Sequence, residues 1–370
     1  MNMKIIHCAD LHLDSNMTSN LTSEKARERK RELLLTFHRM IQYAADNDVR
    51  AILISGDLFD KKRITKAAFQ TVWQAIVEHP HILFFYLPGN HEEDAFLDGQ
   101  EEQPDNLKVF GSTWTSFRFE GSAGWPVTVS GVRLNRDNAG TVFDSLVLDP
   151  DCFNIVMLHG QISEHAAGDK AEIIHIRELK HKGIDYLALG HIHSYREEAL
   201  DARGFYCYPG CLEGRGFDEC GEHGFVRLDI GDTKQSWKRT FVPAAYRHIF
   251  SLDIDVTSCA ATAEIARRIE EALSRHSYPE TSLMKIVLTG EVDVECEKDL
   301  DYLLKQFEHR FYFLKIVDET KLHVDYHSFA LDASLKGEFV RMVMNDEKLG
   351  EEEKADIIRC GIHILAGEEA

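Results

Sequence analysis

Five short motifs in the first 195 residues of the chain place aspartate, histidine or asparagine directly after an apolar stretch. They are "ADLH" with Asp10 and His12, "SGDLFD" with Asp57 and Asp60, "PGNHEE" with Asn90 and His91, "MLHG" with His159, and "LGHIH" with His191 and His193. One such motif alone is an ordinary polar turn. Five in order supply the oxygen and nitrogen donors that suit manganese, iron or zinc.

The number and spacing of these donors indicate two metal ions rather than one. Seven of these side chains, all except Asp60 and His91, are taken as metal donors. Seven donors exceed the needs of one catalytic ion, but they suit two ions about 3.5–4 Å apart that share a bridging carboxylate. Residues two apart on an extended strand point the same way, so Asp10 and His12 are expected to chelate one ion. His191 and His193 are expected to face one cleft and to divide between neighbouring ions. No cysteine belongs to the set, which disfavours a structural thiolate zinc site.

The stretches before these motifs predict the elements that position them. Strands are expected in "KIIHCAD", "AILISGD" and "ILFFYLPGN", with helices from about residue 23 to 47 and from 66 to 78 between them. Shorter strands follow between residues 127 and 242, including "FNIVMLHG", "DYLALGHIH", "GFYCYPG" and "HGFVRLDI". Apolar residues on both faces of such strands predict an α/β fold, a two-sheet sandwich flanked by helices.

The pattern changes after Pro243, which suggests three parts. Residues 1–245 carry the motifs, residues 246–332 read as a smaller α+β domain, and residues 333–370 read as two helices. The apolar stripes of these helices comprise Leu335, Phe339 and Val343 in the first, and Ile358, Ile362 and Leu365 in the second.

Composition indicates a cytoplasmic protein with reduced thiols. The apolar runs of this 370-residue chain are too short to cross a bilayer, and the N-terminus lacks the apolar stretch of a secretory signal. The 8 cysteines are scattered, so most are expected to be reduced and buried. A net charge of -20 argues against broad nonspecific adhesion to nucleic acid. It leaves a phosphate substrate open, because bound divalent cations add local positive charge.

The five motifs together resemble the calcineurin-like metallophosphoesterases, whose pattern is D-x-H, G-D-x-x-D, G-N-H-[DE], H and G-H-x-H. The match covers roughly residues 5 to 195. The resemblance implies a metallophosphoesterase sandwich and two divalent ions, with manganese favoured over iron, zinc or magnesium. It implies that one ion is bound by Asp10, His12 and His193, the other by Asn90, His159 and His191, with Asp57 bridging.

The chemistry that the resemblance implies is phosphodiester hydrolysis. Two metal ions acidify a bridging water into hydroxide, orient the phosphodiester and absorb charge on its oxygens. His91 has no ligand role, so we expect it to donate a proton to the leaving oxygen. In related phosphatases the position of Asp60 pairs with this histidine, and we expect Asp60 to orient His91 and favour its protonated form.

Within this superfamily the chain most resembles SbcD-type DNA-repair exonucleases, the nuclease subunits that work with an SMC-like ATPase. The supporting features are "KIIHCADLHLD", "GDLFD", "YPGCLEG" at residues 208 to 214 and the small domain after residue 245. The resemblance implies exonuclease and endonuclease activity on DNA, an SbcC-type ATPase partner and a possible homodimer. Tyr208 and Gly210 are expected to contact the substrate, although Cys211 stands where serine is common.

Two other functions stay open. A phosphatase or small-molecule phosphodiesterase of the same superfamily is one, but the arginine that follows this motif in protein phosphatases is replaced here by "KKRITK". The basic residues Lys61, Lys62 and Arg63 suit a DNA backbone or are simply solvated. The basic run "KARERKR" at residues 25 to 31 is expected to be a solvated helix face. A catalytically weak scaffold for the ATPase is the other alternative.

The two C-terminal helices have two interpretations. Their apolar stripes could dock on the coiled coil of the ATPase, or they could pack on this chain's own domains.

Overall fold

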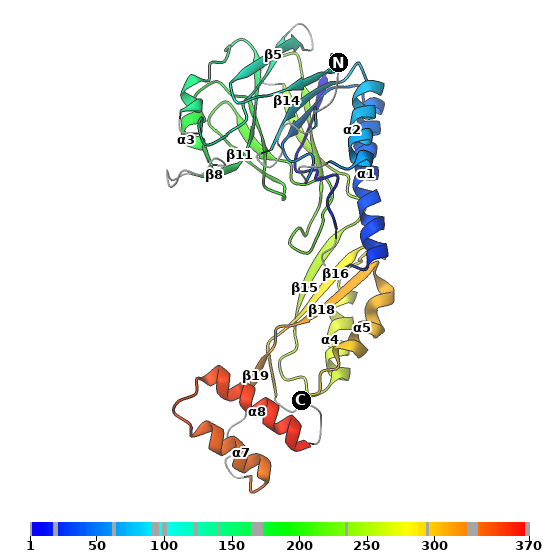
Figure 1. Ribbon diagram of the computed structural model, residues 1–370, viewed down its shortest axis with the longest axis vertical. Helices are drawn as coiled ribbons and strands as arrows, with labels where there is room; N and C mark the ends of the chain where they lie inside the picture. The colour runs from blue at the N-terminus through cyan, green and yellow to red at the C-terminus, as the bar shows by residue number, and fades with distance from the viewer. Residues whose placement is uncertain are drawn as a thin grey trace. The chain divides into compact units, whose positions relative to one another are not determined.

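The computed structural model describes residues 2–17, 21–60, 64–89, 96–97, 102–121, 125–139, 141–163, 173–233, 236–293, 296–323 and 332–366. The chain forms two compact units, Met1–His248 and Ile249–Ala370, which are described separately (Figure 1). Several residues expected at the site lie outside the described residues, namely Lys61, Lys62, Arg63, Asn90 and His91.

The first unit contains two six-stranded sheets, the first of which carries the N-terminal strands. Strands β1 to β4 are parallel, and β13 and β14 extend this sheet in antiparallel fashion beyond β1. The strand order is β14 (Trp237–Pro243), β13 (Gly224–Ile230), β1 (Met3–Cys8), β2 (Val49–Ser55), β3 (Leu83–Leu87) and β4 (Leu107–Val109).

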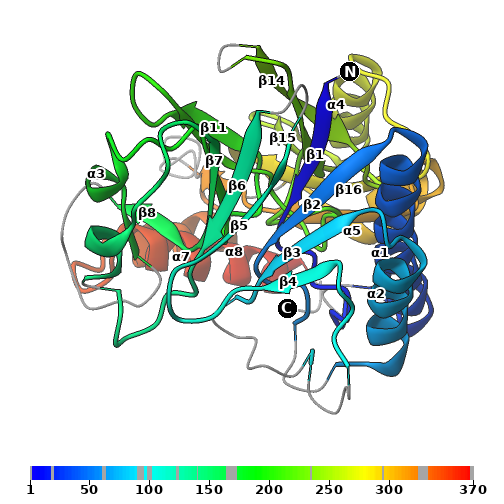
Figure 2. The same cartoon turned by 90° about the horizontal axis from the view of Figure 1, so that it is seen from above.

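The second sheet has a parallel centre and antiparallel edges (Figure 2). Its strand order is β11 (Arg196–Ala199), β12 (Phe205–Tyr208), β10 (Tyr186–Gly190), β7 (Phe153–His159), β6 (Pro126–Gly131) and β5 (Thr115–Glu120). A short parallel pair, β8 (Gln161–Ser163) and β9 (Ile173–His175), follows β7 in the sequence.

Apolar layers on both faces of the sheets explain the continuous apolar runs of the strands. Side chains such as Leu53, Phe85 and Ile155 fill a core shared by strands of both sheets. Helices α1 (Ser23–Asp46) and α2 (Lys66–Glu78) cover the first sheet. The second sheet packs against η2 (Val142–Ser145) and α3 (Ile176–Leu179). The predicted two-sheet sandwich flanked by helices is therefore confirmed.

Helix α1 begins where Thr22 caps it, since the Thr22 side chain accepts a hydrogen bond from the Lys25 backbone N–H at 3.3 Å. The prediction that the basic run at residues 25–31 is only a solvated face is wrong for Arg29. Arg29 is fully buried and donates to Glu32 at 2.6 Å and to Glu213 at 2.9 Å. A buried guanidinium needs such carboxylate partners, and sequence periodicity does not reveal them.

The second unit begins with a three-stranded parallel sheet in the order β15, β16, β18. Its elements are β15 (Ile249–Asp255), α4 (Thr262–Ser274), β16 (Leu283–Thr289), β17 (Glu291–Asp293), α5 (Leu300–Phe307), η3 (Glu308–Arg310), β18 (Phe313–Asp318) and β19 (Lys321–His323). Apolar residues of α4 and α5, such as Ile269 and Leu303, pack with sheet residues such as Ile286 of β16. Strands β17 and β19 form a separate parallel pair.

Helices α7 (Leu335–Met344) and α8 (Glu351–Ala366) end the described part of the second unit. They pack on each other through Val340, Val343, Ile358 and Ile362. Three residues of the predicted docking stripes, Val343, Ile358 and Ile362, are therefore buried between the two helices rather than exposed. The exposed large apolar residues of the pair are Leu335, Met342, Ile357, Ile364 and Leu365.

All eight cysteines lie in the described part of the chain, where none forms a disulfide and only Cys220 and Cys360 are exposed. This confirms that most of the thiols are buried. Among the described residues, no helix is both long and apolar enough to cross a membrane.

Candidate metal centre

Four strand ends from the two sheets bring the predicted ligands together. Strands β1 and β2 of the first sheet lead to Asp10, His12 and Asp57. Strands β7 and β10 of the second sheet lead to His159 and His193. Two groups have donor atoms within 4.8 Å of one another: Asp10 with His12 and His193, and Asp10 with Asp57 and His159.

The backbone at these strand ends adopts an uncommon conformation. Positive φ angles occur at Asp10 (52°), His12 (44°), Asp57 (46°) and His191 (103°). The assumption that Asp10 and His12 sit on an extended strand is therefore wrong, because β1 ends at Cys8. Left-handed backbone at non-glycine residues costs free energy and gathers at functional sites.

Hydrogen bonds between the loops after β1 and β2 hold this conformation. The backbone N–H of Asp10 donates to the Gly56 carbonyl at 3.1 Å, and that of His12 donates to the Asp57 carbonyl at 3.0 Å. Gly56 has a φ of +92°, and a Cβ there would lie 1.9 Å from Nδ1 of His159. Only glycine allows that imidazole to approach the loop.

The first donor group is formed by Asp10, His12 and His193. The Nε2 atoms of the two histidines lie 3.4 Å apart. Each ring has its Nδ1 beside a carboxylate, Asp60 for His12 at 3.1 Å and Glu219 for His193 at 2.6 Å. In both rings Nδ1 faces a carboxylate, so Nε2 is the nitrogen left to bind an ion.

The second donor group contains Asp57 and His159 beside the shared Asp10. Nδ1 of His159 donates to the Ser55 carbonyl at 2.9 Å, so in the neutral ring the lone pair is on Nε2, which lies 3.5 Å from Oδ2 of Asp57. The same Asp57 oxygen lies 4.0 Å from Nε2 of His12. Asp57 therefore lies between donors of both groups.

His191 joins the cluster through its backbone and its ring. Its N–H donates to both carboxylate oxygens of Asp10, at 2.9 and 3.0 Å. Its ring packs edge-on against His159 with centroids 5.6 Å apart.

The electrostatics of the cluster favour a bound cation. Burial raises the pKa of Asp10, and the charge of Asp57 raises it further against the effect of the nearby histidines. Burial lowers the pKa of His159, but hydrogen bonding to Asp57 and the charges of Asp10 and Asp57 raise it overall to about 9. The site thus holds a proton tightly where a metal ion could bind instead. Buried carboxylate and imidazole donors fit a divalent ion.

Asp60 contacts a different histidine from the one expected. Its carboxylate accepts from His12 and lies 3.7 Å from Arg215. The hydrogen bond from His12 is the main reason that the pKa of Asp60 is lowered. His91, the partner expected from the sequence, lies outside the described residues, so their pairing stays a prediction.

The "YPGC" loop contacts the backbone of His193. The Tyr208 side chain is buried and its hydroxyl donates to the Gly160 carbonyl at 2.9 Å, and its contact with a substrate stays a prediction. Gly210 has a φ of +77°, and a Cβ there would lie 2.8 Å from the His193 carbonyl. The Cys211 N–H donates to that same carbonyl at 3.0 Å.

Sequence reasoning missed Arg215 and Glu219. Glu219 is buried, and Arg215 binds it through Nη2 at 2.7 Å and through its backbone N–H at 2.7 Å. The hydrogen bond with Glu219 raises the pKa of His193. Neither residue follows a strand end, so no spacing signal marks them.

Comparisons with known proteins identify the family. The sequence profile of the calcineurin-like phosphoesterases matches residues 3–195. The uncharacterized metallophosphoesterase YhaO of Bacillus subtilis is 28% identical over 289 residues, 74% of this chain and 68% of that protein. The DNA double-strand break repair protein Mre11 of Sulfolobus acidocaldarius is 23% identical over 350 residues, 88% of each chain. The crystal structure of TT1561 of Thermus thermophilus aligns with a TM-score of 0.43 and 14% identity, covering 65% of this chain and 99% of that one.

Proposed function

The chain belongs to the calcineurin-like phosphoesterase family, and from this premise we propose that it is a metal-dependent DNA nuclease of the SbcD type that acts in DNA repair. The observation that best supports hydrolase activity is the pair of donor groups that share Asp10. Support for DNA as the substrate comes from the repair protein Mre11, whose similarity extends over 88% of this chain and therefore beyond the family match.

We propose that Asp10, His12 and His193 hold one ion, that Asn90, His159 and His191 hold the other, and that Asp57 bridges them. Two divalent ions, with manganese our first choice, would supply charge stabilisation and a water of lowered pKa. The carboxylates of Asp60 and Glu219 lie beside Nδ1 of His12 and of His193 and orient these two imidazoles. Lys61, Lys62 and Arg63, on the segment after Asp60, are proposed to contact the DNA backbone.

In this proposal His91 donates the proton that the leaving oxygen requires. The test compares linear duplex DNA, bis(p-nitrophenyl) phosphate and p-nitrophenyl phosphate in Mn²⁺. Release of nucleotides from DNA ends by the wild type, lost in His91→Ala with Mn²⁺ still bound, is expected. Hydrolysis of the monoester alone would make the protein a phosphatase, and no hydrolysis of any substrate would support the scaffold.

We further propose that residues 333–370 dock on an SMC-like ATPase. Leu335 on α7 is 70% exposed and Ile364 on α8 is 56% exposed, so the helix pair offers apolar side chains that its own packing leaves uncovered. Leu335→Glu with Ile364→Glu should abolish co-purification with the ATPase while nuclease activity persists. Retention of the partner by this variant would contradict the docking proposal.

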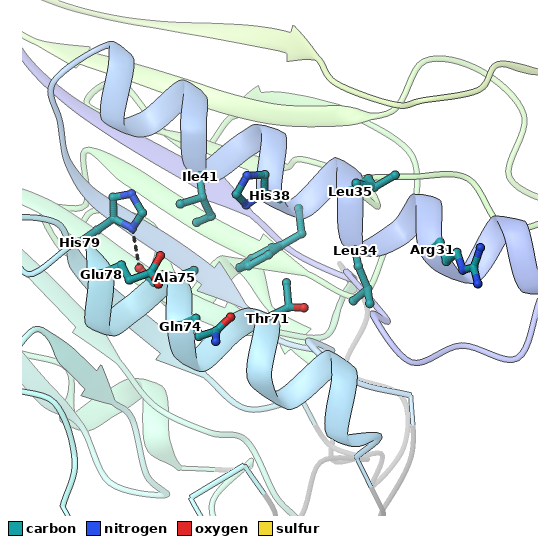
Figure 3. A pocket seen from close by; sticks show the side chains of 11 residues that line it. Arg31, Leu34, Leu35, His38, Ile41, Thr71, Gln74, Ala75, Glu78 and His79 are labelled. Atoms are coloured by element: carbon teal, nitrogen blue, oxygen red, sulfur yellow. Dashed lines mark hydrogen bonds between the residues drawn. The ribbon is translucent and has the colours of Figure 1, made fainter.

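A homodimer is proposed through the groove between α1 and α2, which has a volume of about 480 Å³ (Figure 3). Leu34, Leu35 and Ile41 line it, and Leu35 is 50% exposed. Arg31 and Glu78 lie at opposite ends of the groove. A two-fold axis through its centre would therefore bring each beside the opposite charge of the second copy.

The oligomeric state tests this proposal. Arg31→Glu is expected to dissociate the dimer in light scattering, and the charge swap Arg31→Glu with Glu78→Arg is expected to restore it. A monomeric wild type at micromolar concentration would contradict the proposal.

A further inference from the structure

Three side chains form a connected unit behind the first donor group, and we call Asp60, Arg215 and Glu219 the carboxylate brace. Asp60 lies 3.1 Å from Nδ1 of His12, and Glu219 lies 2.6 Å from Nδ1 of His193. The guanidinium of Arg215 lies between the two carboxylates, 3.7 Å from Asp60 and 2.7 Å from Glu219. Two residues 181 positions apart, His12 and His193, are thus supported by one unit.

The brace selects the tautomer of both imidazoles. A neutral histidine carries its proton on one ring nitrogen, and a carboxylate beside Nδ1 keeps that proton on Nδ1. Nε2 of each ring then keeps its lone pair for an ion. Nη2 of Arg215 is 3.1 Å from Nδ1 of His193, but two donors cannot bond to each other, so Arg215 acts through Glu219.

Arg215 holds Glu219 on several atoms. Its Nε lies 3.2 Å from Oε1 and its backbone N–H lies 2.7 Å from Oε2 of that carboxylate. Although burial raises the pKa of Glu219, the hydrogen bonds from His193 and Arg215 lower it overall. Glu219 is therefore an anion in a fixed orientation.

In the second donor group, His159 is supported in a different way. His159 donates from Nδ1 to the Ser55 carbonyl, a backbone atom of strand β2 in the first sheet. A side-chain substitution cannot remove that acceptor. His12 and His193 are thus supported by carboxylate side chains, whereas His159 is supported by a backbone carbonyl.

We propose that Glu219 and Asp60, joined by Arg215, are positioning residues for one metal ion only, the ion held by Asp10, His12 and His193. The inference rests on the proposed dinuclear site. It predicts that the two ions can be separated by mutation. Loss of an outer carboxylate behind a histidine ligand weakens metal affinity by about 10- to 100-fold, and here the loss should fall on one ion.

The test is a Mn²⁺ titration of chelator-treated protein, in which binding is measured by calorimetry and by electron paramagnetic resonance. Wild type should bind two ions with a spin-coupled spectrum at saturation. Glu219→Gln should weaken one ion by about 10- to 100-fold and leave the other within about threefold, so the uncoupled signal of a single Mn²⁺ persists to higher metal concentration.

Asp229→Asn is the matched control, because Asp229 is also a buried carboxylate paired with an arginine, Arg227 at 3.0 Å. It should bind two ions as the wild type does. Asp60→Asn provides a second variant in case Glu219→Gln unfolds in chelator, since the Asp60 side chain is 35% exposed. It should weaken the same single ion.

Equal weakening of both ions, or unchanged affinity in both variants, would overturn the inference while leaving the proposed function in place. A wild type that binds no Mn²⁺ would overturn the proposed function and the inference with it.

Discussion

The first unit buries two clusters of charged side chains, and they are built in opposite ways. The ion-pair cluster comprises Arg29, Glu32, Glu213 and Arg247. Arg247 donates to Glu32 at 2.5 Å and Arg29 donates to Glu213 at 2.9 Å. Two guanidinium groups thus face two buried carboxylates that balance their charge, and Arg247 also contacts the exposed Glu28 at 3.2 Å. Such a cluster needs no ligand, and its role is to join α1 to distant parts of the chain.

The metal centre instead places carboxylates near each other and near imidazoles on a backbone with positive φ angles. The charge of Asp57 raises the pKa of Asp10, so these two groups oppose each other. The comparison teaches that burial of charge does not identify a functional site. Charge that is balanced by its neighbours stabilises a fold, and charge that is left unbalanced marks where a cation binds.

One loop serves both clusters. Glu213 belongs to the ion-pair cluster, whereas Arg215 and Glu219 belong to the carboxylate brace. Substitutions in the metal centre should therefore change catalysis, and substitutions in the ion-pair cluster should change stability.

The largest effect is expected for Asp57→Asn. Removal of the proposed bridging carboxylate should lower the rate of phosphodiester hydrolysis by about ten thousandfold, since a bound metal contributes several kcal/mol to such reactions. Initial rates on bis(p-nitrophenyl) phosphate in saturating Mn²⁺ measure this, with Asp229→Asn as the control. A loss of less than about tenfold would show that Asp57 is dispensable for the chemistry.

Arg247→Met should lower the stability of the protein and leave its metal binding intact. It leaves Glu32 buried without this partner, and breaking a buried ion pair costs about 3–5 kcal/mol of unfolding free energy. Urea denaturation measures the loss, and the Mn²⁺ affinity of the folded protein should not change. Arg118→Met removes the exposed pair with Asp149 and should cost less than about 1 kcal/mol. Equal costs for the two substitutions would contradict a structural role for the ion-pair cluster.

Mn²⁺ should stabilise the wild type against heat. Binding to the folded state alone contributes about 2.7 kcal/mol at a hundred times the Kd. The melting temperature should therefore rise by several degrees in wild type and in Arg247→Met, and by much less in Asp57→Asn. Equal increases in all three proteins would mean that the stabilising ion binds elsewhere.

The smallest effect is a pH dependence of the metal-free protein. The pKa of His159 is raised to about 9 in the folded state, above the unfolded value of about 6.5. This stabilisation is fully present below pH 6.5 and is lost as pH rises through 9, about 2.5 kcal/mol between pH 7 and 10. Chemical denaturation in chelator measures it against His159→Gln, in which this part of the pH dependence should be absent. Persistence of the full dependence in that variant would assign it to other groups.

The sequence alone supported a large part of the fold. The helix predicted at residues 66–78 is observed as Lys66–Glu78, and the expected strands end at the motif residues or directly before them. These features are local, because apolar periodicity and turn residues are properties of adjacent positions. The family was likewise visible from short motifs, since each keeps its donors within a few residues.

The outer contacts of the site depend on tertiary structure. The sequence did not show that Asp60 contacts His12, that Arg29 is buried, or that Glu219 supports His193. Each of these facts joins segments that are 26 to 184 residues apart. Two features decide such contacts. They are the packing of whole loops and the left-handed backbone at Asp10 and His12.

The sequence by itself therefore determined which residue types end the strands and hence that they suit metal-dependent phosphoester hydrolysis. Only the tertiary structure decided how the imidazoles are oriented and which buried charges are left unbalanced. The physical reason is that a donor's identity belongs to one residue, whereas its tautomer, orientation and charge balance depend on neighbours that the fold supplies.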